Sequence, residues 1–271
     1  TTYKYYVELG SAFNDITPIR TTTSPNNAFA AVANTISAGI SATDTTIPLT
    51  SSSNFPSSGV IQIDSETITY GAVSGNNLIG ATRGAESTTA ATHSSSAAVL
   101  CATITVTDSS HGAVQNDFVT YSSTTTLGGN ITATVLDQEY QIVTIVNTNS
   151  YTIKAKDTSD DTVFANSSDS NNGGTSTSAE YQINVGLDVY VEGTGWGMGL
   201  WGSGGWGSVG TLDNTNQLRL WSHDNFGEDL IMNVRAGGIY YWDESGGTGT
   251  RAVALTALSG ANLAPTKALQ V

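Results

Sequence analysis

The residues best suited to acid–base chemistry lie close together near the end of the chain. His223 stands next to Asp224, and the acidic pair Glu228-Asp229 follows a few positions later. A histidine beside a carboxylate can transfer protons, but neither a nucleophile nor a third ligand is near in the sequence. Hydrogen bonding within a turn explains this group better than catalysis does.

The other carboxylate pairs, Asp160-Asp161 and Asp243-Glu244, are also adjacent in the sequence. Adjacent residues of a strand point to opposite faces, so neither pair forms the facing carboxylates, roughly 5–9.5 Å apart, that a glycosidase needs. The loop 157–161 lacks the ligand spacing of a calcium-binding loop. We therefore expect no catalytic residue, no metal ligand and no cofactor.

Two further reactive residue types have structural explanations. Cys101 is the only cysteine, which excludes an internal disulfide, and its apolar neighbours predict a buried thiol rather than a nucleophile. His111 precedes Gly112 at a turn, so its side chain is expected to cap or bridge that turn.

A segment rich in glycine and tryptophan covers residues 193–207, where eight glycines separate three tryptophans at five-residue intervals. Aromatic faces could stack on sugar rings, but the segment has no carboxylate or amide side chains to bind sugar hydroxyls. Tryptophans that anchor the loop to the protein body or to a neighbouring subunit are the better interpretation. The candidate assembly contacts are the five tryptophans, Trp196, Trp201, Trp206, Trp221 and Trp242.

The composition limits the function classes. Charged residues make up only 12% of the 271 residues and the net charge is −14, which excludes a coiled coil and leaves little with which to neutralise nucleic-acid phosphates. No apolar run approaches the ~20 residues that a membrane-spanning helix needs.

Apolar residues alternate with polar ones along most of the chain, which predicts an all-β fold. The only plausible helix covers residues 28–34. The expected strands are 60–64, 66–70, 103–107, 118–121, 140–146, 150–154, 218–220, 230–234 and 239–242. The four strands at 103–107, 118–121, 140–146 and 150–154 are expected to form one closed or nearly closed β module.

Polar, turn-rich stretches at 21–27 and 167–174 mark loops or linkers. The expected fold consists of small β-barrel or sandwich modules, a Gly/Trp-rich loop and a partial β-propeller blade. The expected segments are an N-terminal segment (1–34), a small β module (35–101), a β-barrel module (102–186), and the Gly/Trp-rich loop with blade-like strands (187–271).

Several strings of the sequence form a familiar set: Tyr6–Gly10, Asp15–Arg20, Val106–Gly112 with Asp117–Val119, Trp221–Ile231 and Gly237–Asp243. Together they resemble strings of the tail nozzle (tail tubular protein B-like) proteins of short-tailed bacteriophages. The most specific are Asp-Ile-Thr-Pro-Ile-Arg (15–20) and the pair formed by Phe-Gly-Glu-Asp-Leu-Ile (226–231) and Tyr-Tyr-Trp-Asp (240–243). In that family the last region resembles the opening blade of a propeller in the nozzle, the ring below the portal and adaptor.

Two internal segments resemble other modules of phage virion proteins. Residues 102–186 resemble a small β-barrel that these proteins share with a domain of ubiquitin-activating enzymes, without the enzyme's chemistry. Residues 59–99 resemble a decoration-type module, and their position suggests that 35–101 is an insertion. A nozzle needs further blades, so the resemblance implies that these residues are part of a longer polypeptide.

The resemblance implies a non-enzymatic structural protein of the virion tail, the nozzle or an adjoining ring, which forms part of the conduit for DNA. It implies a homo-oligomeric, six-fold ring with adaptor or fibre proteins as partners, only passing contact with genomic DNA, and no membrane in the mature particle. One alternative is a receptor-binding or fibre-anchoring tail protein that binds host-surface carbohydrate. Another is a tailspike-like polysaccharide depolymerase.

Overall fold

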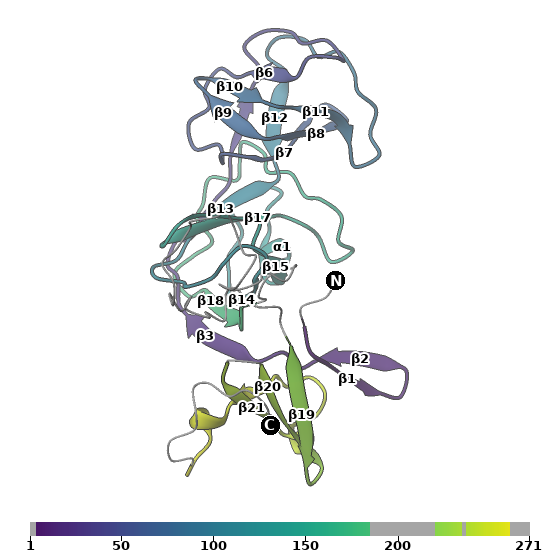
Figure 1. The fold of residues 1–271 in the computed structure, drawn as a ribbon. Helices are drawn as coiled ribbons and strands as arrows, with labels where there is room; N and C mark the ends of the chain where they lie inside the picture. Colours follow the sequence, from purple (N-terminus) through teal and green to yellow (C-terminus); the bar gives the residue numbers. More distant parts are fainter. Residues whose placement is uncertain (1–3, 185–219, 235–236, 261–271) are drawn as a thin grey trace, which may run out of the picture. The chain divides into compact units, whose positions relative to one another are not determined.

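The computed structural model describes residues 4–184, 220–234 and 237–260 (Figure 1). The fold is all-β, as predicted: the described residues form six antiparallel sheets and one short helix, and none of the sheets closes into a barrel. The segment 28–34 is not helical, because β4 (Phe29–Ala30) pairs with β13 and β5 (Ala33–Thr35) pairs with β12. Pairing with distant strands here overrides a weak local preference.

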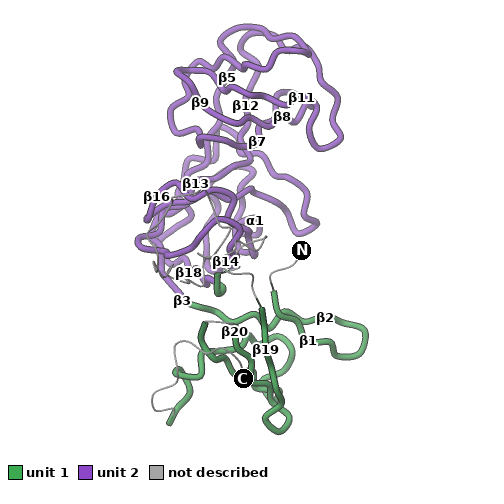
Figure 2. The backbone as a smooth tube through the Cα atoms, in the orientation of Figure 1, with its two compact units in different colours: residues 1–21, 182–271 green, residues 22–181 purple. Residues whose placement is uncertain are grey.

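The chain divides into two compact units (Figure 2). Unit 1 comprises residues 1–21 and 182–271, and unit 2 comprises residues 22–181. Two separate hydrophobic cores lie within unit 2, and a smaller one lies in unit 1. The expected boundaries at 34, 101 and 186 stay predictions.

The first core of unit 2 lies between a five-stranded and a three-stranded sheet. The larger sheet has the order β11-β8-β7-β12-β5 and the smaller has the order β6-β10-β9. Besides β5, these two sheets contain β6 (Thr46–Pro48), β7 (Gly59–Ile63), β8 (Glu66–Tyr70), β9 (Ala72–Ser74), β10 (Asn77–Ile79), β11 (Thr82–Ala85) and β12 (Ala98–Cys101). Ile61 and Ile63 are fully buried while Gln62 between them is not, as the alternation predicts.

The second core of unit 2 lies between two four-stranded sheets, β16-β17-β13-β4 and β15-β14-β18-β3. The elements are β3 (Ile19–Thr23), β13 (Thr103–Thr107), β14 (Phe118–Ser122), α1 (Ala133–Leu136), β15 (Glu139–Gln141), β16 (Thr144–Asn147), β17 (Ser150–Lys154) and β18 (Ser178–Gln182). The predicted strands are present, but they form a sandwich and not a barrel.

The single strand expected at 140–146 is interrupted, and this interruption shows why the module is a sandwich. Ile142 donates its N–H to Asp117 O at 2.8 Å, whereas Val143 donates to Thr152 O at 2.9 Å. The chain therefore passes from one sheet to the other between these two residues. Sequence alternation does not reveal such a change of partner, because both halves of the segment are extended.

Unit 1 contains the hairpin of β1 (Tyr6–Leu9) and β2 (Ala12–Asp15) and a four-stranded sheet of consecutive strands. That sheet consists of β19 (Trp221–Phe226), β20 (Asp229–Val234), β21 (Ile239–Trp242) and β22 (Val253–Ala254), with 3₁₀ turns at Glu244–Gly246 and Leu255–Ala257. Gly227 has φ +73° in the β19–β20 turn, a conformation that favours glycine. The strands expected at 230–234 and 239–242 are confirmed. Of the strand expected at 218–220, residues 218 and 219 lie outside the described residues, and Leu220 precedes β19.

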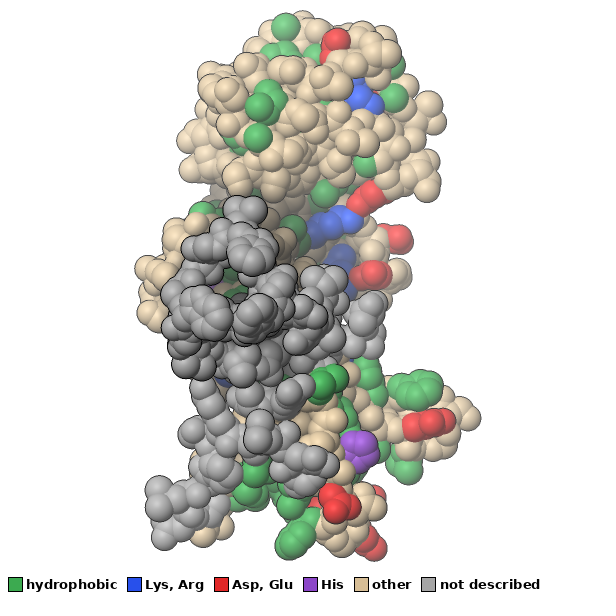
Figure 3. Space-filling view, viewed as in Figure 1, with side chains coloured by type: hydrophobic (Ala, Val, Ile, Leu, Met, Phe, Trp, Pro, Cys, Tyr) green, Lys and Arg blue, Asp and Glu red, His purple; other side chains and the backbone are tan. Residues whose placement is uncertain are grey.

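The surface reflects the low content of charged residues. On the face shown in Figure 3, most atoms of the described residues belong to neither hydrophobic nor charged side chains. Within the described part of the chain, no helix has the length and apolar character needed to span a membrane.

Candidate assembly site and buried polar clusters

Two of the five candidate tryptophans lie among the described residues, and both contact their own unit. Trp242 is 5% exposed and donates its Nε1–H to Thr250 O at 3.1 Å. Trp221 is half-buried, with its ring centroid 4.9 Å from that of Tyr5. Trp196, Trp201 and Trp206 lie outside the described residues. The role of all five as contacts between subunits stays a prediction.

The core of unit 1 joins two segments that are far apart in the sequence. Ile16 is buried in one cluster with Met232, Trp242 and Ala252. The backbone is joined at the same point, because Ala252 donates its N–H to Ile16 O at 3.1 Å and Ile16 donates to Tyr5 O at 3.0 Å. Ile16 of the string 15–20 is therefore part of the core that the blade-like sheet forms.

Asp15 adds ion pairs to this junction. Its carboxylate lies 2.9 Å from Lys4 Nζ and 2.7 Å from an Arg251 guanidinium nitrogen. It also accepts the Thr17 N–H at 2.9 Å. Burial by itself would raise the pKa of Asp15, but the hydrogen bonds from Thr17 and Lys4 outweigh it, and the pKa is lowered. The carboxylate is held in its charged form between the two segments.

Of the acidic residues near His223, Asp229 stabilises a turn, as expected, whereas Asp224 bonds within strand β19. Asp229 accepts hydrogen bonds from the Tyr241 hydroxyl and from the Glu244 N–H. The bond to Asp229 raises the pKa of Tyr241 to about 12. Asp224 accepts the Asn225 N–H at 2.9 Å. His223 lies on the exposed strand β19, edge-on to the Tyr5 ring.

The remaining carboxylate pairs do not converge on any common point. Asp160 is exposed and pairs with Lys156 Nζ at 2.7 Å. Asp243 caps the following 3₁₀ turn by accepting the Ser245 N–H at 2.9 Å. Within the described residues, no group of three histidine, cysteine or acidic side chains is placed to hold a metal ion.

His111 bridges a turn, which confirms its predicted role. It is 1% exposed, and its Nδ1 accepts the Ala113 N–H at 3.0 Å. Its Nε2 lies 3.1 Å from Asn147 O. Because Nδ1 is an acceptor, the ring proton is on Nε2, where it is donated to that carbonyl.

Cys101 is fully buried in the first core of unit 2, as predicted. Burial raises the pKa of its thiol to about 12. Thiolate is the reactive form, so we expect the folded chain to resist alkylation by iodoacetamide at pH 8. Quantitative labelling in denaturant is the positive control, and rapid labelling of the native chain would contradict the assignment. Labelling of Cys101 thus reports unfolding of this core.

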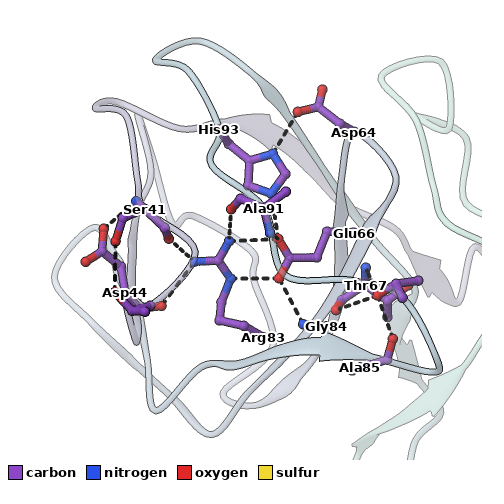
Figure 4. Close-up of polar contacts among 12 residues, drawn as sticks. Ser41, Asp44, Asp64, Glu66, Thr67, Arg83, Gly84, Ala85, Ala91 and His93 are labelled. Carbon is purple, nitrogen blue, oxygen red and sulfur yellow. Dashed lines mark hydrogen bonds and ion pairs between the residues drawn. The ribbon is translucent and has the colours of Figure 1, made fainter.

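A cluster of buried charged side chains lies beside the first core of unit 2. Nothing in the sequence predicted it. The Glu66 carboxylate accepts two hydrogen bonds from the Arg83 guanidinium, one from Nε at 2.8 Å and one from Nη2 at 2.7 Å (Figure 4). It also accepts the N–H groups of Gly84 at 2.9 Å and Ala91 at 3.0 Å, and lies 2.8 Å from His93 Nε2. Glu66 is 1% exposed, so these contacts replace its hydration.

Arg83 extends the cluster to two loops. Its guanidinium donates to the backbone carbonyls of Ser41, Asp44 and Ala91. His93 adds a third connection, because its Nδ1 lies 2.7 Å from the Asp64 carboxylate in the β7–β8 turn. The cluster thus fixes the loop before β6, the β7–β8 turn and the loop after β11 to one another.

A second buried polar group crosses the sandwich core. The hydroxyls of Tyr121, Tyr151 and Tyr181 form a chain, and Tyr181 donates to the buried Asp108 carboxylate at 2.6 Å. Burial raises the pKa of each of these tyrosines. The hydroxyls therefore stay protonated and serve as a hydrogen-bonded link between the two sheets.

Asp169 holds a third group together. Its two oxygens accept the N–H groups of Gly129, Asn130, Ile131 and Asn166 at 2.8–3.0 Å. A Cβ at Gly129 would lie 2.7 Å from Asp169 Oδ2, so only glycine fits there. One carboxylate therefore serves as the acceptor for four backbone N–H groups, in place of backbone carbonyls.

We expect Asp169→Asn to lower the free energy of unfolding by about 2 kcal/mol, because its amide NH₂ would face two backbone donors. Urea unfolding monitored by circular dichroism measures the change. Asp160→Asn, at an exposed carboxylate, is the matched control and is expected to change stability by less than about 0.5 kcal/mol. Equal effects of the two variants would show that the Asp169 contacts contribute nothing.

The sequence carried no signal that these groups meet. Nothing in the spacing of Asp64, Glu66 and Arg83 indicates that they contact His93. Comparisons with protein-family models, with curated proteins and with solved structures found no match for this chain.

Proposed function

We propose that this chain is a structural component of a bacteriophage virion tail, either the nozzle or an adjoining ring, and that it forms part of the conduit for DNA delivery. It acts without enzymatic chemistry, as a homo-oligomeric, six-fold ring that contacts adaptor or fibre proteins. The proposal starts from the resemblance to the tail nozzle proteins of short-tailed phages.

The observation that supports it best is the core of unit 1. The two most specific strings of the resemblance, 15–20 and the pair 226–231 with 240–243, lie about 200 residues apart in the sequence. Ile16 from the first packs with Trp242 from the second. Strings that belong to one ancestral domain should fold together in this way, with residues 22–181 carried between them.

The roles found for the acidic residues and histidines agree with a structural protein. Among the described residues, Asp229 and Asp243 stabilise turns, and His111 bridges one. The net charge of −14 suits a conduit wall that does not retain DNA.

The decisive measurement is the assembly state. Mass photometry and negative-stain microscopy of the recombinant chain are expected to reveal closed rings. Trp→Ala at positions 196, 201 and 206 together is expected to impair assembly or stability without changing glycan binding. A monomer that binds a glycan array would favour the receptor-binding alternative, and release of reducing ends from capsule would favour a depolymerase.

A further inference from the structure

The hydrogen-bond partners of Glu66 indicate which groups of the cluster carry a proton. All five groups around the Glu66 carboxylate are nitrogen atoms, four of which belong to Arg83, Gly84 and Ala91 and can only donate. Burial by itself would raise the pKa of Glu66, but the bonds from Arg83, Ala91, His93 and Gly84 hold it at about 2. Glu66 is therefore a carboxylate, and His93 Nε2 must donate to it.

The same reasoning applies to the other ring nitrogen of His93. Nδ1 lies 2.7 Å from the carboxylate of Asp64, whose side chain is 64% exposed to solvent. A carboxylate in water is ionised at neutral pH and can only accept. A neutral imidazole has one N–H, so it would direct a lone pair at one of these two carboxylates. Both contacts are satisfied only when the ring carries two protons.

The surrounding charges agree with this count. The His93 side chain is 2% exposed. Asp64 faces it from the β7–β8 turn, Glu66 faces it from β8, and Arg83 on β11 is bound to Glu66. Asp44, in the loop that Arg83 contacts, is exposed and accepts the Ser41 N–H. Asp64, Glu66 and Arg83 together carry a net charge of −1, which a positive His93 balances.

We propose that His93 is a proton-operated clasp: with both ring nitrogens protonated it links the loop 86–93 to β8 and to the β7–β8 turn, and loss of one proton removes one of these two links while the bonds of Ala91 to Glu66 and Arg83 remain. The inference is independent of the proposed function. It rests on the positions of the two carboxylates at opposite nitrogens of one buried ring.

The loop that the clasp holds is strained and makes a further contact. Glu86 and Ser87 have φ +52° and +64°, left-handed values that are costly for residues other than glycine. Glu86 binds Lys154 Nζ and accepts the Thr162 hydroxyl at 2.8 Å. A less firmly held loop would also weaken these bonds to the sandwich module of unit 2.

The protonation state can be measured directly on the unchanged chain labelled with ¹⁵N-histidine. At neutral pH, long-range ¹H–¹⁵N correlation spectra are expected to show both His93 ring nitrogens protonated. His111, whose Nδ1 accepts the Ala113 N–H, is the internal control and should show one unprotonated nitrogen. One unprotonated nitrogen at His93 would overturn the proposal.

The effect on the fold is measured by thermal unfolding against pH. Stability is expected to fall as the pH rises through the loss of the His93 proton, and Asp64→Asn is expected to shift this fall to lower pH. Glu180→Gln removes an exposed carboxylate on β18 and should leave its position unchanged. The same profile in Asp64→Asn and Glu180→Gln would also overturn the proposal.

Discussion

Replacement of Glu66 by glutamine is expected to lower the free energy of unfolding of the module around the first core by about 3–5 kcal/mol, because removal of one partner leaves a buried charge uncompensated. Arg83 and His93 would lose their shared carboxylate, and the new NH₂ group would face N–H donors of Gly84 or Ala91. The three loops that the cluster joins would lose their common attachment.

Urea unfolding with Cys101 labelling as the local probe measures this loss, since Cys101 lies in the same core. Labelling should occur at lower urea concentration in Glu66→Gln than in the unchanged chain. Glu180→Gln provides the control for removal of a negative charge at an exposed position. Equal unfolding midpoints for the two variants would show that the cluster adds no net stability.

The lowered pKa of Glu66 predicts that the free energy of unfolding decreases at acidic pH. Its folded value of about 2 lies below its ordinary value of 4.5, so the contribution to stability is complete above pH 4.5 and is lost as the pH falls toward 2. The linkage amounts to about 3 kcal/mol. The acid-induced loss should be smaller by about this amount in Glu66→Gln, and an unchanged acid profile would contradict the assignment.

Replacement of Trp242 by alanine is expected to cost unit 1 about 3–5 kcal/mol, the usual effect of truncating a buried aromatic side chain. The core of unit 1 is small: Ile16, Met232 and Ala252 are its other fully buried members among the described residues. The variant also leaves Thr250 O without its indole donor. Because so few side chains share this core, a single truncation should unfold most of the unit.

Thermal unfolding followed by tryptophan fluorescence would show an early transition in Trp242→Ala, while Cys101 should stay protected at that temperature. Phe226→Ala is the matched control, because Phe226 is 66% exposed and its loss should change the midpoint little. Trp242→Phe should have an intermediate effect. A melting curve of Trp242→Ala that matches the Phe226→Ala curve would show that Trp242 does not hold the unit together.

The sequence alone determined much of the local structure of this protein, with residues 28–34 and 140–146 as the exceptions. The alternation at 60–63 and 103–107 predicts strands with one buried face, and β7 and β13 have it. The apolar neighbours of Cys101 predict burial, and the position of His111 before Gly112 predicts the bridged turn. These features depend on residues close in the chain, where the period of the backbone and the chemistry of a turn act directly.

The tertiary structure alone decided which distant residues meet. Ile142 and Val143 are neighbours in the sequence but bond to different sheets, which makes the module a sandwich. Glu66 and His93, 27 residues apart, face each other across a buried cluster, and Ile16 reaches the core of a sheet that begins at Trp221. Such contacts arise from the pairing of whole strands and from the need to satisfy buried polar groups. No local spacing in the sequence encodes them.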